Sequence, residues 1–167
     1  YAAVQYIIQN VTNYNSRNIL VFGLGKMGKH TCKNLAEYTS NSSVCLINRT
    51  QQKAISFVKE HHSIRNSNIN NLTAEISNSD ILIVSTGSDK PTITKKHIEK
   101  NKKILILDLS MPENVDRSVN ELDNVSLINV DELSKITLET LSKRQNEIPK
   151  AEQIIKVYKE EFNDWLN

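Results

Sequence analysis

The chain has 167 residues and a mass of 19.0 kDa, and 38% of its residues are hydrophobic and 24% charged, which predicts one ordinary soluble domain, with or without an appendage. This composition excludes the collagen-like, mucin-like and disordered-tail classes. A formal net charge of +2, with basic residues spread along the chain, is too weak and too diffuse to indicate a nucleic-acid surface.

Cysteine content and apolar run length bear on where the protein works. The longest apolar runs, such as residues 81–84 and 104–107, are far shorter than the roughly 18 residues of a membrane span, so we expect no membrane association. Cys32 and Cys45 are too few for a disulfide framework and lack zinc-ligand spacing, which predicts a reducing compartment, by default the cytoplasm. Because the chain opens at Tyr1 without a methionine and closes on an apolar helical pattern, we expect a piece of a longer protein.

Helical and strand patterns alternate over residues 1–130. Helical spacing over residues 1–12 predicts a lead-in helix, with 1–14 as its segment. Short apolar runs predict strands at residues 18–22, 44–47, 63–65, 80–85, 104–109 and 125–130. Helical patterns separate them, one through Leu35 and Ala36 and others at residues 54–58, 72–76, 94–99 and 115–122.

These strand patterns are continuous rather than alternating in hydrophobicity. Strands that are apolar on both faces and separated by helices indicate a doubly wound, mostly parallel α/β sheet of six strands in a Rossmann fold. The expected strand order is 3-2-1-4-5-6, with a ligand crevice at the carboxyl ends of the first and fourth strands. We assign residues 15–145 to this domain.

The last segment has a different pattern. Its pattern predicts a helix from Asp131, and Pro149 is expected to start or kink a second helical stretch. An apolar stripe follows with spacings of 3, 4, 3, 4 and 3, formed by Ile148, Ala151, Ile155, Tyr158, Phe162 and Trp165. This spacing favours the seam of a coiled coil or a stem over residues 146–167, which packs on another chain or domain. The alternative is an amphipathic helix docked on its own sheet.

A glycine motif, G-x-G-x-x-G, follows the first strand directly and opens the first crossover helix. It contains three of the four glycines of the chain. Gly23 permits the tight turn, Gly25 lets backbone approach a pyrophosphate, and Gly28 allows close helix–strand packing, while free amides at the helix start face the anion. The predicted cofactor-binding residues here are Gly23, Leu24, Gly25, Lys26, Met27 and Gly28.

The second strand ends in Asn48, Arg49 and Thr50, where a dinucleotide site that reads the ribose 2′-hydroxyl carries an acidic residue about twenty residues beyond the motif. No acid is present. Arg49 can grip a 2′-phosphate in a bidentate fork, Thr50 can donate a hydroxyl, and Lys53 follows one turn later. These residues predict NADP(H). Alternatively, Thr50 caps the next helix and Arg49 is solvated.

Two further loops reach the same edge of the predicted sheet. Ser85, Thr86 and Gly87 follow the fourth strand, where the pyrophosphate and nicotinamide ribose would pass, although Gly87 equally suits a turn with positive φ. The fifth strand ends at Asp108, followed by Ser110, and both are candidate cofactor-binding residues. Structural capping is the stronger interpretation of Asp108.

Other reactive residue types lack a catalytic or metal-binding context. Both cysteines lie on apolar patterns typical of buried hydrophobes, and His30, His61, His62 and His97 are expected to be solvated. Lys26, Lys29 and Lys33 are expected mainly to form a wet helix face. No hydrolase or metalloenzyme motif occurs, so we predict neither a catalytic residue nor a metal site in this chain.

Together these motifs resemble the NADP-binding domain of the glutamyl-tRNA reductase family over nearly the whole chain. The similar segments are residues 1–4 (the helix leading into the domain), 23–28, 48–50, 85–87, 108–112 with 114–116 (a D-[IL]-[AS]-x-P…[DN]-[IV] pattern), and 122–125 with 131–133. The last helix resembles the start of the long spinal helix that carries the family's dimerisation domain.

The resemblance implies NADPH-dependent reduction of glutamyl-tRNA to glutamate-1-semialdehyde in tetrapyrrole (porphyrin) synthesis, and a homodimer through the last helix. The family's thioester-forming cysteine belongs to a separate amino-terminal domain, so neither Cys32 nor Cys45 inherits its role. Alternatives are another NADP-dependent oxidoreductase, such as a shikimate dehydrogenase or a sirohaem-pathway dehydrogenase, and a non-catalytic nucleotide-sensing module that associates through its last helix.

Overall fold

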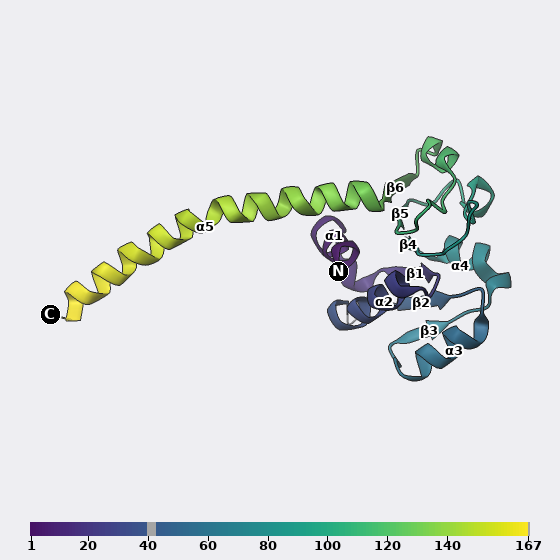
Figure 1. Cartoon of the computed structure of the whole chain (residues 1–167), viewed down its shortest axis with the longest axis horizontal. Coiled ribbons are helices and arrows are strands. Elements are labelled where there is room, and N and C mark those ends of the chain that lie inside the picture. The colour runs from purple at the N-terminus through teal and green to yellow at the C-terminus, as the bar shows by residue number, and fades with distance from the viewer. Residues whose placement is uncertain (40–42, 167) are drawn as a thin grey trace. The chain divides into compact units, whose positions relative to one another are not determined.

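The computed structural model describes residues 1–39 and 43–166, and its centre is one parallel sheet of six strands. The strands run in the order β3-β2-β1-β4-β5-β6, which confirms the predicted order (Figure 1). They are β1 (Asn18–Phe22), β2 (Ser43–Ile47), β3 (Ile64–Asn66), β4 (Ile81–Val84), β5 (Ile104–Asp108) and β6 (Val125–Asn129). Each lies within two residues of its predicted run.

Helices cover both faces of this sheet. The α-helices are α1 (Ala2–Asn10), α2 (Lys26–Tyr38), α3 (Gln51–Lys59), α4 (Leu72–Asn78) and α5 (Val130–Leu166). Short 3₁₀ helices are η1 (Tyr14–Ser16), η2 (Ile69–Asn71), η3 (Lys95–His97) and η4 (Arg117–Glu121). The predictions of helix at residues 94–99 and 115–122 were therefore too long, since only η3 and η4 form there.

The two core layers follow from the period-2 geometry of the strands. On β1, Ile19 and Val21 enter one layer with residues of α1, α2 and α3, whereas Leu20 and Phe22 enter the other with residues of α4. Every residue of β4 is buried, which is why its sequence is apolar without alternation. The sheet thus holds the carboxyl ends of β1 and β4 side by side.

The chain divides into two compact units, Tyr1–Leu133 and Ser134–Asn167. The first unit contains the sheet and ends with Leu133, which is buried in the core. The second unit is the remainder of α5, which continues through Pro149 instead of restarting there. In Figure 1 the axis of α5 changes direction between its green and yellow parts, as expected of a helix with an internal proline.

Candidate cofactor-binding site

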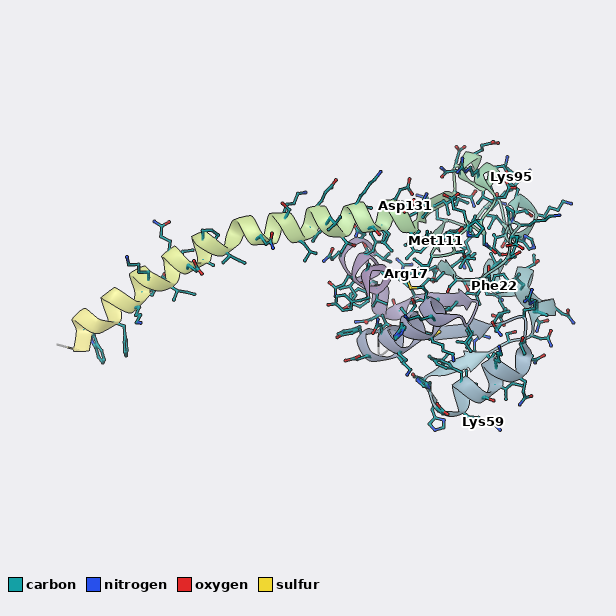
Figure 2. All side chains as sticks on the ribbon, viewed as in Figure 1. Arg17, Phe22, Lys59, Lys95, Met111 and Asp131 are labelled. Carbon is teal, nitrogen blue, oxygen red and sulfur yellow. The ribbon has the colours of Figure 1, made fainter. Side chains whose placement is uncertain are left out.

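A cleft with an empty volume of about 560 Å³ lies at the carboxyl ends of β1, β2 and β4. Its position matches the crevice expected where the strand order of a doubly wound sheet reverses. Figure 2 marks Phe22 at the end of β1, which is one of the lining residues. Predicted site residues that line the cleft are Gly23, Leu24, Gly25, Asn48, Arg49, Ser85, Thr86 and Gly87.

The glycine loop forms one wall of the cleft, and two of its glycines are required by the fold. Gly23 has a φ of +108°, and a Cβ there would lie 2.2 Å from the carbonyl oxygen of Ser85. A Cβ on Gly28 would lie 2.1 Å from the carbonyl oxygen of Gly23. These contacts confirm the predicted tight turn and the close approach of helix to strand.

Gly25 differs from both of these glycines. The nearest atom to a Cβ built there is the carbonyl oxygen of Ser85 at 3.9 Å, and its φ of −72° is open to any residue. The fold therefore does not need glycine at this position. The cleft beside it is the space that a Cβ would enter, which fits the close approach of a ligand.

The backbone amides at the start of α2 belong to the second half of this glycine loop. Gly25 is the N-cap without a side-chain cap, and the first backbone hydrogen bond of the turn runs from Lys29 N to Gly25 O at 3.0 Å. Within the described chain, the amides of Lys26, Met27 and Gly28 donate to no protein acceptor. A 13-residue helix with free amides and the positive end of its dipole can bind an anion. The side chains of Lys26 and Met27 are exposed.

Asn48 joins the glycine loop to the turn after β2. Its Oδ1 accepts a hydrogen bond from the amide of Leu24 at 3.0 Å, and its Nδ2 donates to the carbonyl oxygen of Thr50 at 2.9 Å. Leu24 itself is buried, so it supports the loop from inside. Asn48 lines the cleft while both ends of its amide are held by protein.

The side chains that follow Asn48 are exposed and free. Within the described chain the guanidinium of Arg49 makes no hydrogen bond or ion pair, and Arg49 lines the cleft. Thr50 is the N-cap of α3, but its side chain makes no capping hydrogen bond. Lys53 is exposed one turn later and donates its amide to the carbonyl oxygen of Thr50 at 3.1 Å. Thr50 therefore occupies the capping position named in the alternative, but its hydroxyl makes no capping hydrogen bond there.

The loops after β4 and β5 hold each other. The amide of Thr86 donates to Ser110 Oγ at 3.2 Å, and Thr86 Oγ1 donates to Asn114 Oδ1 at 2.6 Å. Gly87 does not have a positive φ, so its alternative role in such a turn is wrong, and nothing lies within 4 Å of a Cβ built there. Ser85 continues the strand ladder, with its amide donating to the carbonyl oxygen of Phe22 at 2.8 Å.

Asp108 holds the loop after β5 and does not line the cleft. It is 1% exposed, and its carboxylate accepts from the amides of Ser110, Asn114 and Val115 at 3.0, 2.7 and 2.8 Å. This pattern confirms structural capping, because all three hydrogen bonds to the carboxylate come from backbone amides of the loop that follows β5. Ser110 is likewise buried and acts on the cleft through the amide of Thr86.

Sequence reasoning missed some residues of this site. Phe22, Ser88 and Thr92 line the cleft, and Asn114 lies behind it, fully buried. Phe22 and Ser88 flank predicted segments, so a wider window would have included them. Thr92 and Asn114 reach the site only through the folding of their loops.

The cysteines are buried, as predicted, whereas two histidine predictions were wrong. Burial raises the pKa of Cys32 to about 12 and that of Cys45 to about 11, so neither thiol is a nucleophile near neutral pH. His30 and His62 are exposed. His61 instead stacks on Phe57 with ring centroids 4.2 Å apart, and His97 belongs to a capping box at η3.

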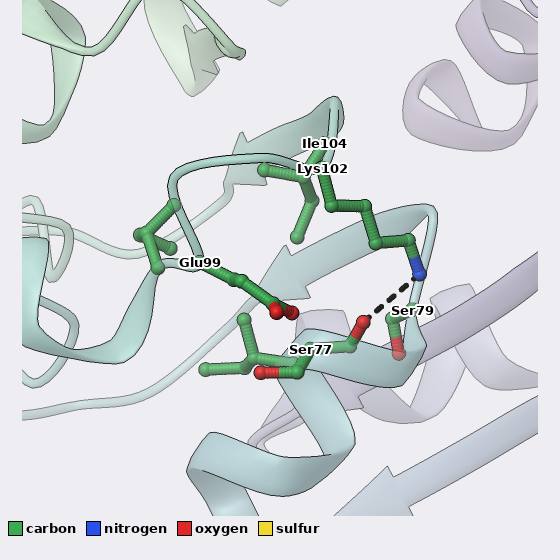
Figure 3. Close-up of a pocket in the computed structure, with 7 residues that line it drawn as sticks. Ser77, Ser79, Glu99, Lys102 and Ile104 are labelled. Atoms are coloured by element: carbon green, nitrogen blue, oxygen red, sulfur yellow. Dashed lines mark hydrogen bonds between the residues drawn. The ribbon is translucent and has the colours of Figure 1, made fainter.

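The opposite, amino edge of the sheet carries a smaller hollow with an empty volume of about 180 Å³. Figure 3 shows Lys102 reaching across it, where its Nζ donates to the carbonyl oxygen of Ser77 at 3.0 Å. Across residues 1–39 and 43–166, no three His, Cys, Asp or Glu side chains gather as metal ligands. The same part of the chain holds no helix that is both long and apolar enough to cross a membrane.

Comparisons with known proteins give the chain its relatives. A sequence model of the shikimate / quinate 5-dehydrogenase family matches residues 5–136. Glutamyl-tRNA reductase of Christiangramia forsetii is 49% identical over 99% of this chain, and that of Flavobacterium psychrophilum is 47% identical over 100%. The chain spans about 40% of the length of each of these curated relatives.

Two solved structures of glutamyl-tRNA reductases are also similar to this chain. Glutamyl-tRNA reductase from Methanopyrus kandleri is 26% identical with a TM-score of 0.77, covering 93% of this chain and 40% of its own. The nucleotide binding domain of glutamyl-tRNA reductase from Thermoplasma volcanium is 23% identical with a TM-score of 0.65, covering 85% of this chain and 96% of its own. The latter likeness shows the shared fold alone.

Proposed function

The chain belongs to the shikimate / quinate 5-dehydrogenase family, and on this premise we propose that it is the NADP-binding domain of a glutamyl-tRNA reductase. The observation that carries the choice of NADP(H) over NAD(H) is the free guanidinium of Arg49 on the lip of the cleft. An acidic side chain at this position would repel a 2′-phosphate, whereas a guanidinium can bind one through two parallel hydrogen bonds.

The residues of the cleft fit such a cofactor in two places. The free amides of Lys26, Met27 and Gly28 suit a pyrophosphate, and the bare Cα of Gly25 leaves room for its approach. Arg49, with the free hydroxyl of Thr50, suits the 2′-phosphate. When bound, the cofactor supplies a hydride, and the chain's own residues hold and orient it at the sheet edge.

Calorimetric titration of the chain with NADPH and NADH tests the choice of cofactor. We expect tighter binding of NADPH, and we expect Arg49→Ala to weaken NADPH binding by about 1.5–3 kcal/mol while leaving NADH unchanged. Lys59→Ala is the matched control, because it removes an exposed positive charge from the last turn of α3. Equal affinities for NADPH and NADH, or an Arg49→Ala variant that binds NADPH normally, would refute the assignment.

The curated relatives, of whose length this chain spans about 40%, are glutamyl-tRNA reductases, and this supports a proposal for the activity of the whole protein. We propose that it reduces glutamyl-tRNA to glutamate-1-semialdehyde in tetrapyrrole synthesis, in the cytoplasm. The resemblance places the acyl chemistry on a cysteine outside this chain. The raised pKa values of Cys32 and Cys45 support that division, because neither buried thiol offers a thiolate. This domain then contributes the hydride donor's site, and its 1–14, 15–145 and 146–167 segments remain the proposed division.

The apolar stripe of α5 supports a proposed homodimer. Ile148, Ile155, Tyr158, Phe162 and Trp165 are between 53% and 80% exposed. Sedimentation velocity tests this proposal: the full chain should dimerise, and the chain cut before Pro149 should be monomeric. Ile155→Asp should weaken the dimer, whereas Lys156→Asp on the adjoining position should not. A monomer mass for the uncut chain would count against association through this segment.

A further inference from the structure

Asn114 is fully buried between the loops after β4 and β5 and does not line the cleft. Its side-chain Oδ1 accepts the 2.6 Å hydrogen bond from Thr86 Oγ1. Its Nδ2 donates to the carbonyl oxygens of Ser88 and Pro112, both at 2.9 Å. One amide group therefore joins two segments that are far apart in sequence.

The backbone of Asn114 is used as fully as its side chain. Its amide donates to Asp108 at 2.7 Å. Its carbonyl oxygen accepts from the amides of Thr92 and Ile93 at 2.8 and 3.0 Å. Thr86, Ser88 and Thr92, three residues of the cleft wall, are thus all held by this one residue.

This wall belongs to one half of the proposed ligand. A dinucleotide lies across the point where strand order reverses, so its adenine half lies toward β2 and Arg49 and its nicotinamide half toward β4 and β5. Resting on the proposed function, we infer that Asn114 is a positioning residue for the nicotinamide half of the cofactor. It acts through the residues it holds, without touching the cofactor.

The physical reason is the cost of releasing those groups. Without the Asn114 amide, the Thr86 hydroxyl loses its acceptor and the carbonyl oxygens of Ser88 and Pro112 lose their donor. Polar groups left without partners re-orient toward water, which moves the wall on which the nicotinamide half would rest. The adenine side is held separately, by Asn48 between Leu24 and Thr50.

Titration with two different ligands distinguishes an effect on the nicotinamide side of the cleft from an effect on the adenine side. NADPH spans the whole cleft, whereas adenosine 2′,5′-bisphosphate offers only the adenine side with its 2′-phosphate. In calorimetric titrations of the full chain, we expect Asn114→Ala to weaken NADPH by about tenfold and the bisphosphate by less than about twofold. Equal losses for both ligands would indicate a merely structural role and would overturn the inference, as would an unchanged NADPH affinity.

Asn124→Ala is the matched structural control. Asn124 Nδ2 also joins two turns, donating to the carbonyl oxygens of Glu99 and Lys102 at 2.8 and 2.6 Å, but at the amino edge of the sheet. Glu99 and Lys102 are two of the residues of that edge that Figure 3 labels. This control should lower thermal stability while keeping the ratio of the two affinities.

A second variant covers failure of Asn114→Ala to fold. Asn114→Asp keeps the volume and the acceptor for Thr86. It removes the Nδ2 donors, so NADPH should weaken about threefold with the bisphosphate unchanged. An unaltered affinity ratio would overturn the inference. If the wild-type chain bound the bisphosphate but gained nothing from the nicotinamide half, only this inference would fail; if it bound neither ligand, the proposed function would fail with it.

Discussion

Gly25→Ala should separate cofactor binding from folding. The new methyl group would meet no protein atom nearer than 3.9 Å, and the φ of −72° suits alanine. Alanine lowers the conformational entropy of the unfolded chain, which stabilises the folded variant by about 0.4–1 kcal/mol. Alanine is a poorer N-cap residue than glycine, and this offsets part of the gain. We therefore expect its free energy of unfolding to stay within about 0.5 kcal/mol of the wild-type value.

The same methyl group would stand in the approach to the free amides of α2. A pyrophosphate held off those amides loses charge-assisted hydrogen bonds, each worth about 1.5–3 kcal/mol. We expect NADPH affinity to fall by at least about tenfold, since 1.4 kcal/mol corresponds to a factor of ten. The measurements are calorimetric titration with NADPH and urea unfolding of the same preparations.

Gly28→Ala is the contrasting variant. Its methyl group would lie 2.1 Å from the carbonyl oxygen of Gly23, and because that atom is backbone, the helix or the loop must shift. Overpacking of this kind costs about 2–3 kcal/mol, which corresponds to a melting temperature lower by roughly 4–12 °C. Normal NADPH binding by Gly25→Ala, or a loss of stability equal to that of Gly28→Ala, would refute the assignment of Gly25 to ligand approach.

Three further predictions concern titration and the buried carboxylate. Cys32 and Cys45, with pKa values raised to about 12 and about 11, should not react with a disulfide reagent at pH 8 until urea unfolds the chain. Because burial raises both pKa values above the ordinary 9.0, the contribution of the protonated thiols to stability is complete below pH 9 and declines above it. Above pH 9 the free energy of unfolding should therefore fall more steeply for the wild-type chain than for a variant with both cysteines replaced by alanine. Hydrogen bonds from Arg65 lower the pKa of Glu75, and because the Arg65 side chain is 52% exposed, Glu75→Gln should cost less than about 1 kcal/mol at pH 7. Urea unfolding at a series of pH values should show this difference in stability shrinking as the pH falls below 4.5 and protonates Glu75. Asp108→Asn should lower the free energy of unfolding by about 1.5–3 kcal/mol in urea, because an amide donor then faces amide donors, and an unchanged midpoint would contradict its capping role.

Strand positions were predictable because a strand buried on both faces leaves a direct trace in the sequence. Residues 81–84 are an unbroken apolar run, and all are buried in β4. The segments at 94–99 and 115–122 misled because apolar spacing alone cannot distinguish a helix from an irregular segment that buries the same side chains. Ile93 and Val115 form a parallel β-bridge, so the backbone is extended at the start of each segment. In these segments, only the short 3₁₀ helices η3 and η4 form after these two residues.

The candidate site was predictable where local backbone geometry decides the residue type. Gly23 and Gly28 are needed by contacts within one turn and its neighbouring strand, so a short motif reveals them. Asn48 was assigned to the ligand because of its place at a strand end, yet both ends of its amide are bound to the backbone of the fold. Asp108 was a candidate for the same reason, and its expected capping role is the one that the fold uses. For Asn48, its place at the strand end did not reveal that the fold uses both ends of its amide.

That distinction identifies which side chains remain available for a ligand. In the cleft of the described chain, Asn48 has both ends of its amide occupied, while the guanidinium of Arg49 beside it has no partner. A charged group that the fold does not need contributes little to stability where it stands, because exposed charges interact weakly in water. The guanidinium of Arg49 is therefore available to bind a ligand. Replacing Arg49 should change the affinity for NADPH and leave the melting temperature of the chain nearly unaltered. Asn114 presents the opposite case, because the fold uses all of its polar side-chain atoms. A change of that side chain reaches the cleft through Thr86 and Ser88, the two wall residues to which it is bonded.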